Sequence, residues 1–202
     1  MKIVFAVILL FVMADSSGAV VDPDPNSIGV YFDQYADVNY MDVAPNVEFS
    51  AYVILTNPTW DFVQGVEFSF ELEIPAGMEG MIYRLGRILP PTTMFPIGDE
   101  TTPLGGYCIF GMGVPYPTSA ATVLVEWVFL MTEPMTIEFY LGPSPVPTLP
   151  DGLPVIENEN NELMSLGVSS GDVAFPVAEV NTGHQPVGDK SVAWGGVKSL
   201  FR

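Results

Sequence analysis

The sequence predicts an all-β protein that folds as a single β-sandwich of about nine strands, with jelly-roll or immunoglobulin-like connections. One observation is the strict alternation of apolar and polar residues in several short segments, which is typical of strands with one buried face. A second is the frequent punctuation by 19 Gly and 19 Pro among 202 residues, which favours many tight turns. The third is that no segment before residue 190 has the apolar period of a long helix.

The segment Val63–Pro75 shows this alternation most clearly. Its apolar positions recur at every second residue and are separated by acidic or small polar positions; the apolar set is Val66, Phe68, Phe70, Leu72 and Ile74, and the polar set is Glu67, Ser69, Glu71 and Glu73. Since successive side chains of a strand point to opposite faces, we expect the first set to lie in the core. We expect the three glutamates to form a solvated outer face.

Further strands are predicted on both sides of this segment. The candidates are Ile28–Asp33, Val47–Asn57, Met81–Leu89, Tyr107–Met112, Thr122–Met131, Met135–Leu141, Val155–Glu157, Leu163–Leu166 and Gly171–Pro176. Met81–Leu89 also fits one short helical turn, although its apolar pattern favours a strand. Thr122–Met131 is apolar at almost every position, as in a central strand covered on both sides, and it is expected to form a hairpin with Met135–Leu141. Pro90–Leu104 is expected to be a long loop.

The ends of the chain differ from the middle. Residues 1–19 combine Lys2, an apolar run and small residues at Ser17–Ala19, which is the pattern of a secretory signal peptide; a cut after Ala14 is the alternative. The expected organisation is then a leader at 20–27, the sandwich at 28–176, a flexible linker at 177–190 and a short C-terminal segment at 191–202. No later run reaches the roughly 20 apolar residues of a membrane span. The protein is therefore expected to be secreted, with no membrane insertion after signal cleavage.

The charge balance excludes several classes of partner. The formal net charge is −18, with 24 acidic and 6 basic residues. A surface of this kind repels phosphate backbones and anionic lipid, so no nucleic-acid partner is expected. It is compatible with calcium, with a basic protein partner, or with solubility alone.

The residues needed for catalysis are scarce, and we expect no enzyme and no cofactor. His184 is the only histidine and lies in the Gly/Pro-rich linker, whereas a general base needs a fixed geometry. Cys108 is the only cysteine and is expected to be a buried thiol. A zinc site needs more His and Cys ligands than these two residues supply. Glycoside hydrolysis would need only two carboxylates, but the acids here fall mainly on outward strand positions.

Calcium is not indicated by a motif but stays open. Asp22, Asp24, Asn26 and Asp33 have the 1, 3, 5, 12 spacing of a calcium loop, yet Ser27 replaces the required glycine at position 6. Scattered loop acids offer the other set of ligands: Asp37, Asp42, Asp61 and Asp99.

Aromatic residues outside the predicted core are the candidate binding residues. By strand parity or loop position these are Tyr52, Trp60, Tyr116 and Tyr140, whereas Trp127 falls on the inward positions of its strand. Rings on an open surface are suited to stacking on sugars or to packing on a protein partner. Ordinary edge packing is the alternative for all four.

The C-terminal segment SVAWGGVKSLFR ends an acidic chain with aromatic and basic residues. Trp194, Val197 and Phe201 can share one helical face, with Lys198 and Arg202 on another, although Gly195 and Gly196 weaken a helix. This segment is interpreted as a docking or sorting segment. A frayed chain end is the alternative.

The order of these features resembles the cohesin-like β-sandwich of bacterial extracellular scaffolds. The matching pieces are Ile28–Asp33, Val47–Thr59, Val63–Leu72 and Val168–Ala174, so the resemblance covers roughly residues 28–176. It implies a non-catalytic module that binds a protein partner in an extracellular or cell-surface assembly. Carbohydrate-binding modules share this architecture and imply a polysaccharide partner instead; a glycoside hydrolase and a purely structural surface protein are the remaining alternatives. No binding residue can be transferred by motif, because Glu73-Ile74-Pro75 stands where cohesins carry a Tyr-Asp type motif.

Overall fold

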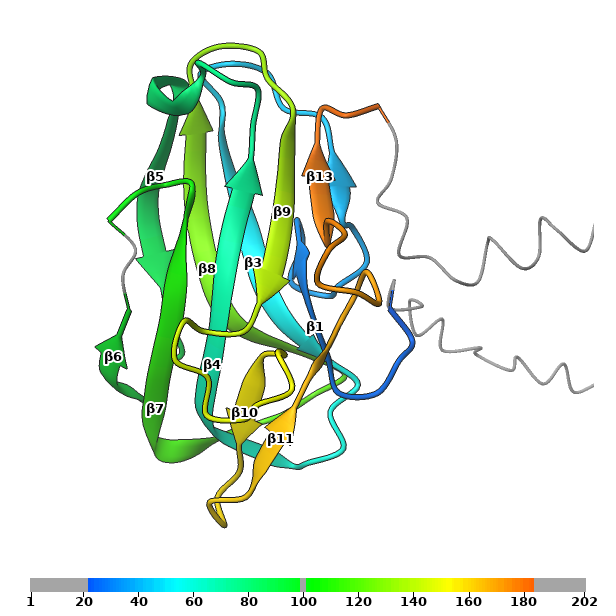
Figure 1. Cartoon of the computed structure of the whole chain (residues 1–202), viewed down its shortest axis with the longest axis vertical. Helices are drawn as coiled ribbons and strands as arrows, with labels where there is room; N and C mark the ends of the chain where they lie inside the picture. The colour runs from blue at the N-terminus through cyan, green and yellow to red at the C-terminus, as the bar shows by residue number, and fades with distance from the viewer. Residues whose placement is uncertain (1–21, 99–100, 184–202) are drawn as a thin grey trace, which may run out of the picture.

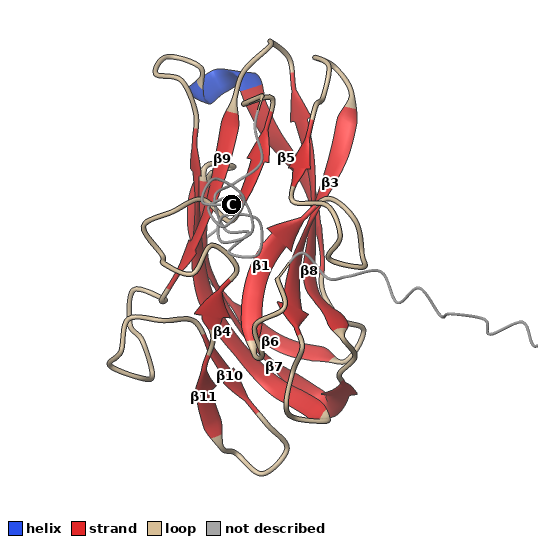
Figure 2. Cartoon of the chain, turned by 90° about the vertical axis from the view of Figure 1, so that its right-hand side faces the viewer, coloured by secondary structure: helices blue, strands red, loops and turns tan. Residues whose placement is uncertain are grey.

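Two packed β-sheets make up the protein, as the sequence predicted (Figure 1). The computed structural model describes residues 22–98 and 101–183. Within these residues there are thirteen strands and one short 3₁₀ helix, η1 (Glu79–Met81). Eight strands have five residues or more, and the other five are short additions of two or three residues. Figure 2 shows the two layers side by side: one contains β4 and β9, and the other contains β3 and β8.

The five-stranded sheet, called sheet A here, has the order β12-β1-β3-β8-β5. Its strands are β1 (Ser27–Tyr31), β3 (Glu48–Thr56), β5 (Ile82–Ile88), β8 (Ala121–Met131) and β12 (Gly167–Val168). The pairing is antiparallel except between β1 and β12. Bulges interrupt the register at Val53/Ile54 and at Arg84/Gly86, and a bulge bends a strand locally.

The eight-stranded sheet, sheet B, is built around β4, the alternating segment of the sequence. Its strands are β2 (Tyr40–Met41), β4 (Phe62–Glu73), β6 (Thr93–Ile97), β7 (Gly105–Pro117), β9 (Ile137–Gly142), β10 (Val155–Glu157), β11 (Leu163–Ser165) and β13 (Ala178–Val180). One edge of β4 pairs with β7, and the other pairs first with β10 and then with β9. β4 is thus the central strand of this sheet.

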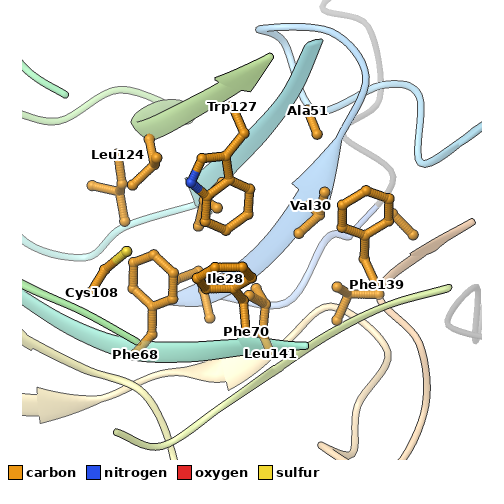
Figure 3. Close-up of a cluster of buried hydrophobic side chains, with 14 of the residues drawn as sticks. Ile28, Val30, Ala51, Phe68, Phe70, Cys108, Leu124, Trp127, Phe139 and Leu141 are labelled. Carbon is orange, nitrogen blue, oxygen red and sulfur yellow. The ribbon is translucent and has the colours of Figure 1, made fainter. Parts of the chain in front are cut away.

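The core lies between the two sheets and is rich in aromatic rings. Trp127 of β8 points toward Phe68 and Phe70 of β4, with ring centroids 6.4 and 4.5 Å apart (Figure 3). Phe129 continues the cluster toward Phe139 at 5.8 Å. All five rings are at most 3% exposed. Burial of a large apolar side chain contributes roughly 1.5–3 kcal/mol, so this cluster is a main source of stability.

The alternation of β4 predicted its core face correctly, and Trp127 is buried as expected. Cys108 on β7 is also buried, as predicted. The strands predicted at 155–157 and 163–166 are confirmed as β10 and β11. They pair antiparallel as a hairpin, and Asn161 N donates to Asn158 O at 3.1 Å in its turn.

The hairpin predicted for 122–131 and 135–141 is wrong. β8 belongs to sheet A and β9 to sheet B, so the residues between them cross from one layer to the other. Most consecutive strands in the described chain cross in the same way, whereas β6–β7 and β10–β11 pair as hairpins. The connection is short enough for either arrangement, so its length did not decide between a hairpin and a crossover.

Two further boundaries differ from the expectation. The proline-rich segment 90–104 was predicted to be a loop, but it contains β6, an edge strand in which a proline is tolerated. Gly171–Pro176 was predicted to be a strand but forms turns, in which Ser170 Oγ donates to the carbonyl oxygens of Asp172 and Phe175.

The predicted domain limits at 28 and 176 are also too narrow. β1 already begins at Ser27, inside the expected leader. The expected linker at 177–190 starts with a buried strand, β13, which pairs with β9 on one side and β2 on the other. The three residues of β13 are too few for a periodic signal, and their place is fixed by partners distant in sequence. The rest of the expected linker beyond residue 183 lies outside the described residues.

Candidate functional site

The four predicted binding aromatics do not form one site. Tyr52 lies on the outer face of sheet A, and Tyr140 lies on the outer face of sheet B. Trp60 and Tyr116 lie at one end of the sandwich, where Thr118 follows β7 and its Oγ1 donates to the carbonyl oxygen of Trp60 at 2.6 Å. Both Trp60 and Tyr116 are partly buried against the main core. For Trp60 this supports the edge-packing alternative, whereas Tyr116 packs in the same way but also lines an open cavity.

Tyr140 is engaged by the acids around it. Its hydroxyl donates to Glu138 Oε2 at 2.7 Å, and Glu71 lies directly opposite it on β4. Burial, followed by the hydrogen bond and charge of Glu138 and the charge of Glu73, raises the pKa of Tyr140 above its ordinary value. This ring is therefore part of an acidic surface and does not form a free stacking platform.

The other sequence-predicted residues lie outside the part of the chain that the structure describes. They are Trp194, Val197, Lys198, Phe201 and Arg202 of the C-terminal segment, together with His184. The docking or sorting role of that segment stays a prediction.

Glu67 contradicts the expectation that the glutamates of β4 form a solvated face. It is 8% exposed, and its carboxylate accepts hydrogen bonds from Ser144 Oγ at 2.9 Å, Thr148 N at 2.9 Å and Thr148 Oγ1. The loop 143–153 is thereby attached to the outer face of sheet B. Glu71 and Glu73 are exposed, as predicted. Alternation alone could not separate the three, because the loop that covers Glu67 is about 80 residues away in sequence.

An apolar patch occupies the outer face of sheet A. Cross-strand register places Tyr83 beside Leu130, Gly86 beside Val128, and Ile88 beside Glu126. Tyr52 of β3 is the neighbour of Glu126 on its other side. The name open face is used below for the side chains that these rows bring together, namely Tyr52, Tyr83, Ile88, Val128 and Leu130.

These side chains are accessible to a partner. Tyr83 is 46% and Ile88 is 58% exposed, and the other three are partly exposed. Gly86 has no side chain to cover Val128, its neighbour in the register. A contiguous group of accessible apolar side chains on a folded protein is typical of a contact surface.

Acidic groups border this patch. Glu126 accepts a hydrogen bond from Ser50 Oγ at 2.9 Å, and Glu48 is exposed next to Leu130 in the register. An apolar centre with a polar border is the usual composition of a protein interface. The surface is thus chemically suited to a partner that offers apolar side chains surrounded by basic ones.

The rest of the outer face of sheet A is covered by the chain itself. Tyr31 and Ile54 also point outward from their strands, but both are fully buried together with Ala36 of the loop after β1. The loop leaves the β5 side of the face uncovered. At that side Arg84 Cζ lies 5.2 Å from the centre of the Phe70 ring, so β5 is joined to sheet B by a cation–π contact.

Sequence reasoning missed most of the open face. Met81–Leu89 was ambiguous between strand and helix, and Thr122–Met131 was expected to be covered on both sides. A usable signal was present in TVLVEWVFLM, where the outward positions Val128 and Leu130 are as apolar as their buried neighbours. Their exposure depends on what covers the sheet, which local sequence does not specify.

In the segments 22–98 and 101–183, no three His, Cys, Asp or Glu side chains are grouped so that they could hold a metal ion. No helix within those segments is long and apolar enough to cross a membrane.

Known structures with the same architecture are cohesin modules. The sixth cohesin of scaffoldin B from Acetivibrio cellulolyticus, solved in complex with a Cel5 dockerin, superposes with a TM-score of 0.53 at 8% identity, covering 78% of this chain and 99% of that one. The protein has a cohesin-like fold. The module CaCohA2 from Clostridium acetobutylicum, solved in its complex with CaDoc0917, gives a TM-score of 0.51 at 10% identity, covering 76% of this chain and 96% of that one.

No protein-family model and no curated protein matches the sequence. The two solved cohesin modules confirm, at the level of the fold, the cohesin-like sandwich inferred from the order of strands.

Proposed function

We propose that this cohesin-like protein is a secreted, non-catalytic module that binds a protein partner through the open face. The observation that carries the proposal is the apolar patch on sheet A. The described residues leave it uncovered, while they cover both the neighbouring part of that face and part of sheet B. A surface that serves only solubility would be expected to carry charges at Tyr83, Ile88 and Val128.

The partner we propose is an extracellular protein module of the dockerin kind. In their crystal structures the cohesin of scaffoldin B is bound to a dockerin and CaCohA2 is bound to CaDoc0917. The acidic border of the open face favours a partner surface with lysine or arginine around an apolar centre. The apolar run and small residues of the first nineteen positions support secretion, and hence an extracellular or cell-surface location.

A matched pair of substitutions tests the proposal. Ile88 on the open face and Ile97 on β6 of the other sheet have nearly equal exposure, 58% and 60%. The wild type, Ile88→Glu and Ile97→Glu are each immobilised and presented with purified dockerin modules and with secreted protein of the producing cells. We expect one protein to bind the wild type and Ile97→Glu equally, and to bind Ile88→Glu at least tenfold more weakly, because a buried glutamate at the contact would be unpaired.

Circular dichroism and the urea midpoint would check that both variants are folded. The proposal is wrong if no protein distinguishes the two variants, or if Ile97→Glu loses the partner while Ile88→Glu keeps it.

A further inference from the structure

A groove lined by two tyrosines lies at the other end of β8 from the centre of the open face. It is an open cavity of about 500 Å³ between the loop that follows β1 and the turn that joins β7 to β8. The residues that matter here are Gln34, Tyr35, Asp37, Tyr116 and Ser119, and they define what is called the tyrosine groove below. Its volume is within the range of ligand sites in proteins.

The wall that carries Tyr35 is held in place by local hydrogen bonds. Asp33 Oδ1 accepts from the backbone N of Tyr35 at 3.1 Å and of Asp37 at 3.0 Å. Ala36 between them is fully buried against Tyr31 and has a φ of 61°, which fixes the loop on the sheet. Tyr35 is nevertheless 74% exposed. An exposed aromatic ring on an anchored loop loses little conformational freedom when it meets a ligand.

The opposite wall is anchored as well. Tyr116 pairs with Val63 of β4, and Thr118 N donates to Asp61 O at 2.9 Å. In the turn, Ser119 N donates to Thr122 Oγ1 at 2.8 Å. The two tyrosines are therefore carried by two separate and fixed segments.

The chemistry of these walls fits a neutral sugar. The faces of aromatic rings pack on the C–H faces of a pyranose, while an amide and a carboxylate such as Gln34 and Asp37 exchange hydrogen bonds with its hydroxyl groups. The charged side chain of the groove is acidic, and the net charge of the chain is −18, so phosphate and uronate groups would be repelled. Because the groove is open to solvent, a chain of sugar units can lie in it without being enclosed.

We propose that the tyrosine groove binds a stretch of neutral polysaccharide, with Tyr35 and Tyr116 stacking on sugar rings and Gln34 and Asp37 bonding their hydroxyls. This site is separate from the protein-binding surface proposed above, and neither depends on the other. It also selects among the aromatics predicted from the sequence: Tyr116 is retained, Tyr35 is added, and Trp60 does not line the groove.

Affinity electrophoresis of the whole chain tests this site. Native gels would contain barley β-glucan, xyloglucan, glucomannan, xylan, amylopectin or glycol chitin as neutral polysaccharides, and polygalacturonate as the anionic one. We expect retardation in at least one neutral gel and none in polygalacturonate. Tyr35→Ala should weaken binding about tenfold, which corresponds to the loss of one stacked ring. Asp37→Ala should weaken it by a smaller factor.

Ile88→Glu is the control, because Ile88 lies on the open face and the substitution should leave retardation unchanged. Since Tyr35 is mostly exposed, its variant is expected to fold, and its urea midpoint checks this. The proposal is overturned if none of the neutral polysaccharides retards the protein, or if only polygalacturonate does. It is also overturned if the folded Tyr35→Ala variant is retarded as strongly as the wild type. Loss of protein binding in Ile88→Glu with retained retardation would show that the two sites are independent.

Discussion

The outer faces of the two sheets are built differently, although both come from strands with one apolar side. On sheet B, β4 and β9 place four glutamates outward, namely Glu67, Glu71, Glu73 and Glu138, and part of the face lies under the loop that Glu67 attaches. On sheet A, Val128 and Leu130 are apolar outward residues that no segment within 22–98 and 101–183 covers, and β5 adds Tyr83 and Ile88 beside them. The charges on β4 and β9 keep their part of sheet B solvated, whereas the β5 and β8 side of sheet A exposes apolar side chains.

The largest effect on stability is expected at the covered part of sheet B. Glu67→Ala leaves Ser144 Oγ, Thr148 N and Thr148 Oγ1 without their acceptor, and should lower the free energy of unfolding by about 3 kcal/mol. Glu71→Ala, on the same face but exposed, should change it by less than about 0.5 kcal/mol. Urea denaturation of both variants measures the contrast. Equal effects would mean that the loop 143–153 is not held by Glu67.

Alkaline pH should lower the free energy of unfolding, because a tyrosine on the outer face of each sheet holds its proton more tightly in the folded state. Burial raises the pKa of Tyr31 and of Tyr140 above the ordinary 10.0, assisted by the charge of Asp22 for the first and by Glu138 for the second. The folded state therefore binds these protons more tightly than the unfolded chain. The resulting stabilisation is complete below about pH 10 and is lost as the pH rises beyond it.

The measurement is the urea midpoint between pH 8 and pH 11, for the wild type and for Tyr31→Phe and Tyr140→Phe. Each variant should show a smaller fall above pH 10 than the wild type. A midpoint that stays constant to pH 11 would contradict this expectation.

A smaller effect, of opposite sign, is expected at the exposed acids of sheet B. Glu73 and Glu138 are directly opposite each other on β4 and β9, and like charges in that position are destabilising. Glu73→Gln should raise the free energy of unfolding by roughly 0.2–1 kcal/mol at low salt. The gain should shrink in 0.5 M NaCl, because salt screens the repulsion between the two carboxylates. Thermal unfolding at the two salt concentrations checks it, and a gain that is independent of salt would rule out repulsion as the cause.

The smallest effect on stability is expected on the open face. Ile88→Glu should change the free energy of unfolding by less than about 0.5 kcal/mol, because Ile88 is 58% exposed and loses little burial. The same substitution is expected to abolish most partner binding. If the free energy of unfolding instead fell by several kcal/mol, Ile88 would be needed for stability, and its substitution could not test binding alone.

β4 shows which features of the fold are predictable from the sequence and which are not. Its period of two predicted the strand and the inward positions of Phe68 and Phe70. The same period assigned Glu67 to solvent, which was wrong because the covering loop approaches from residues 144 and 148. β8 shows the same limit, since its inward Trp127 was predicted correctly and its partner strand was not.

The candidate sites were less predictable than the fold. Tyr52 was selected by strand parity and Tyr116 by its loop position, and they fall on the open face and in the tyrosine groove respectively. Ile88, Val128 and Tyr35 carry no motif, and their accessibility depends on neighbours up to about 90 residues away.

The sequence by itself determined the fold class, the core face of β4 and the acidic character of the chain, because periodicity and charge are local properties. Only the tertiary structure decided which strands share a sheet, which outer face is covered and where grooves open. These features arise from pairing and packing between segments distant in sequence, for which many arrangements satisfy the same local pattern.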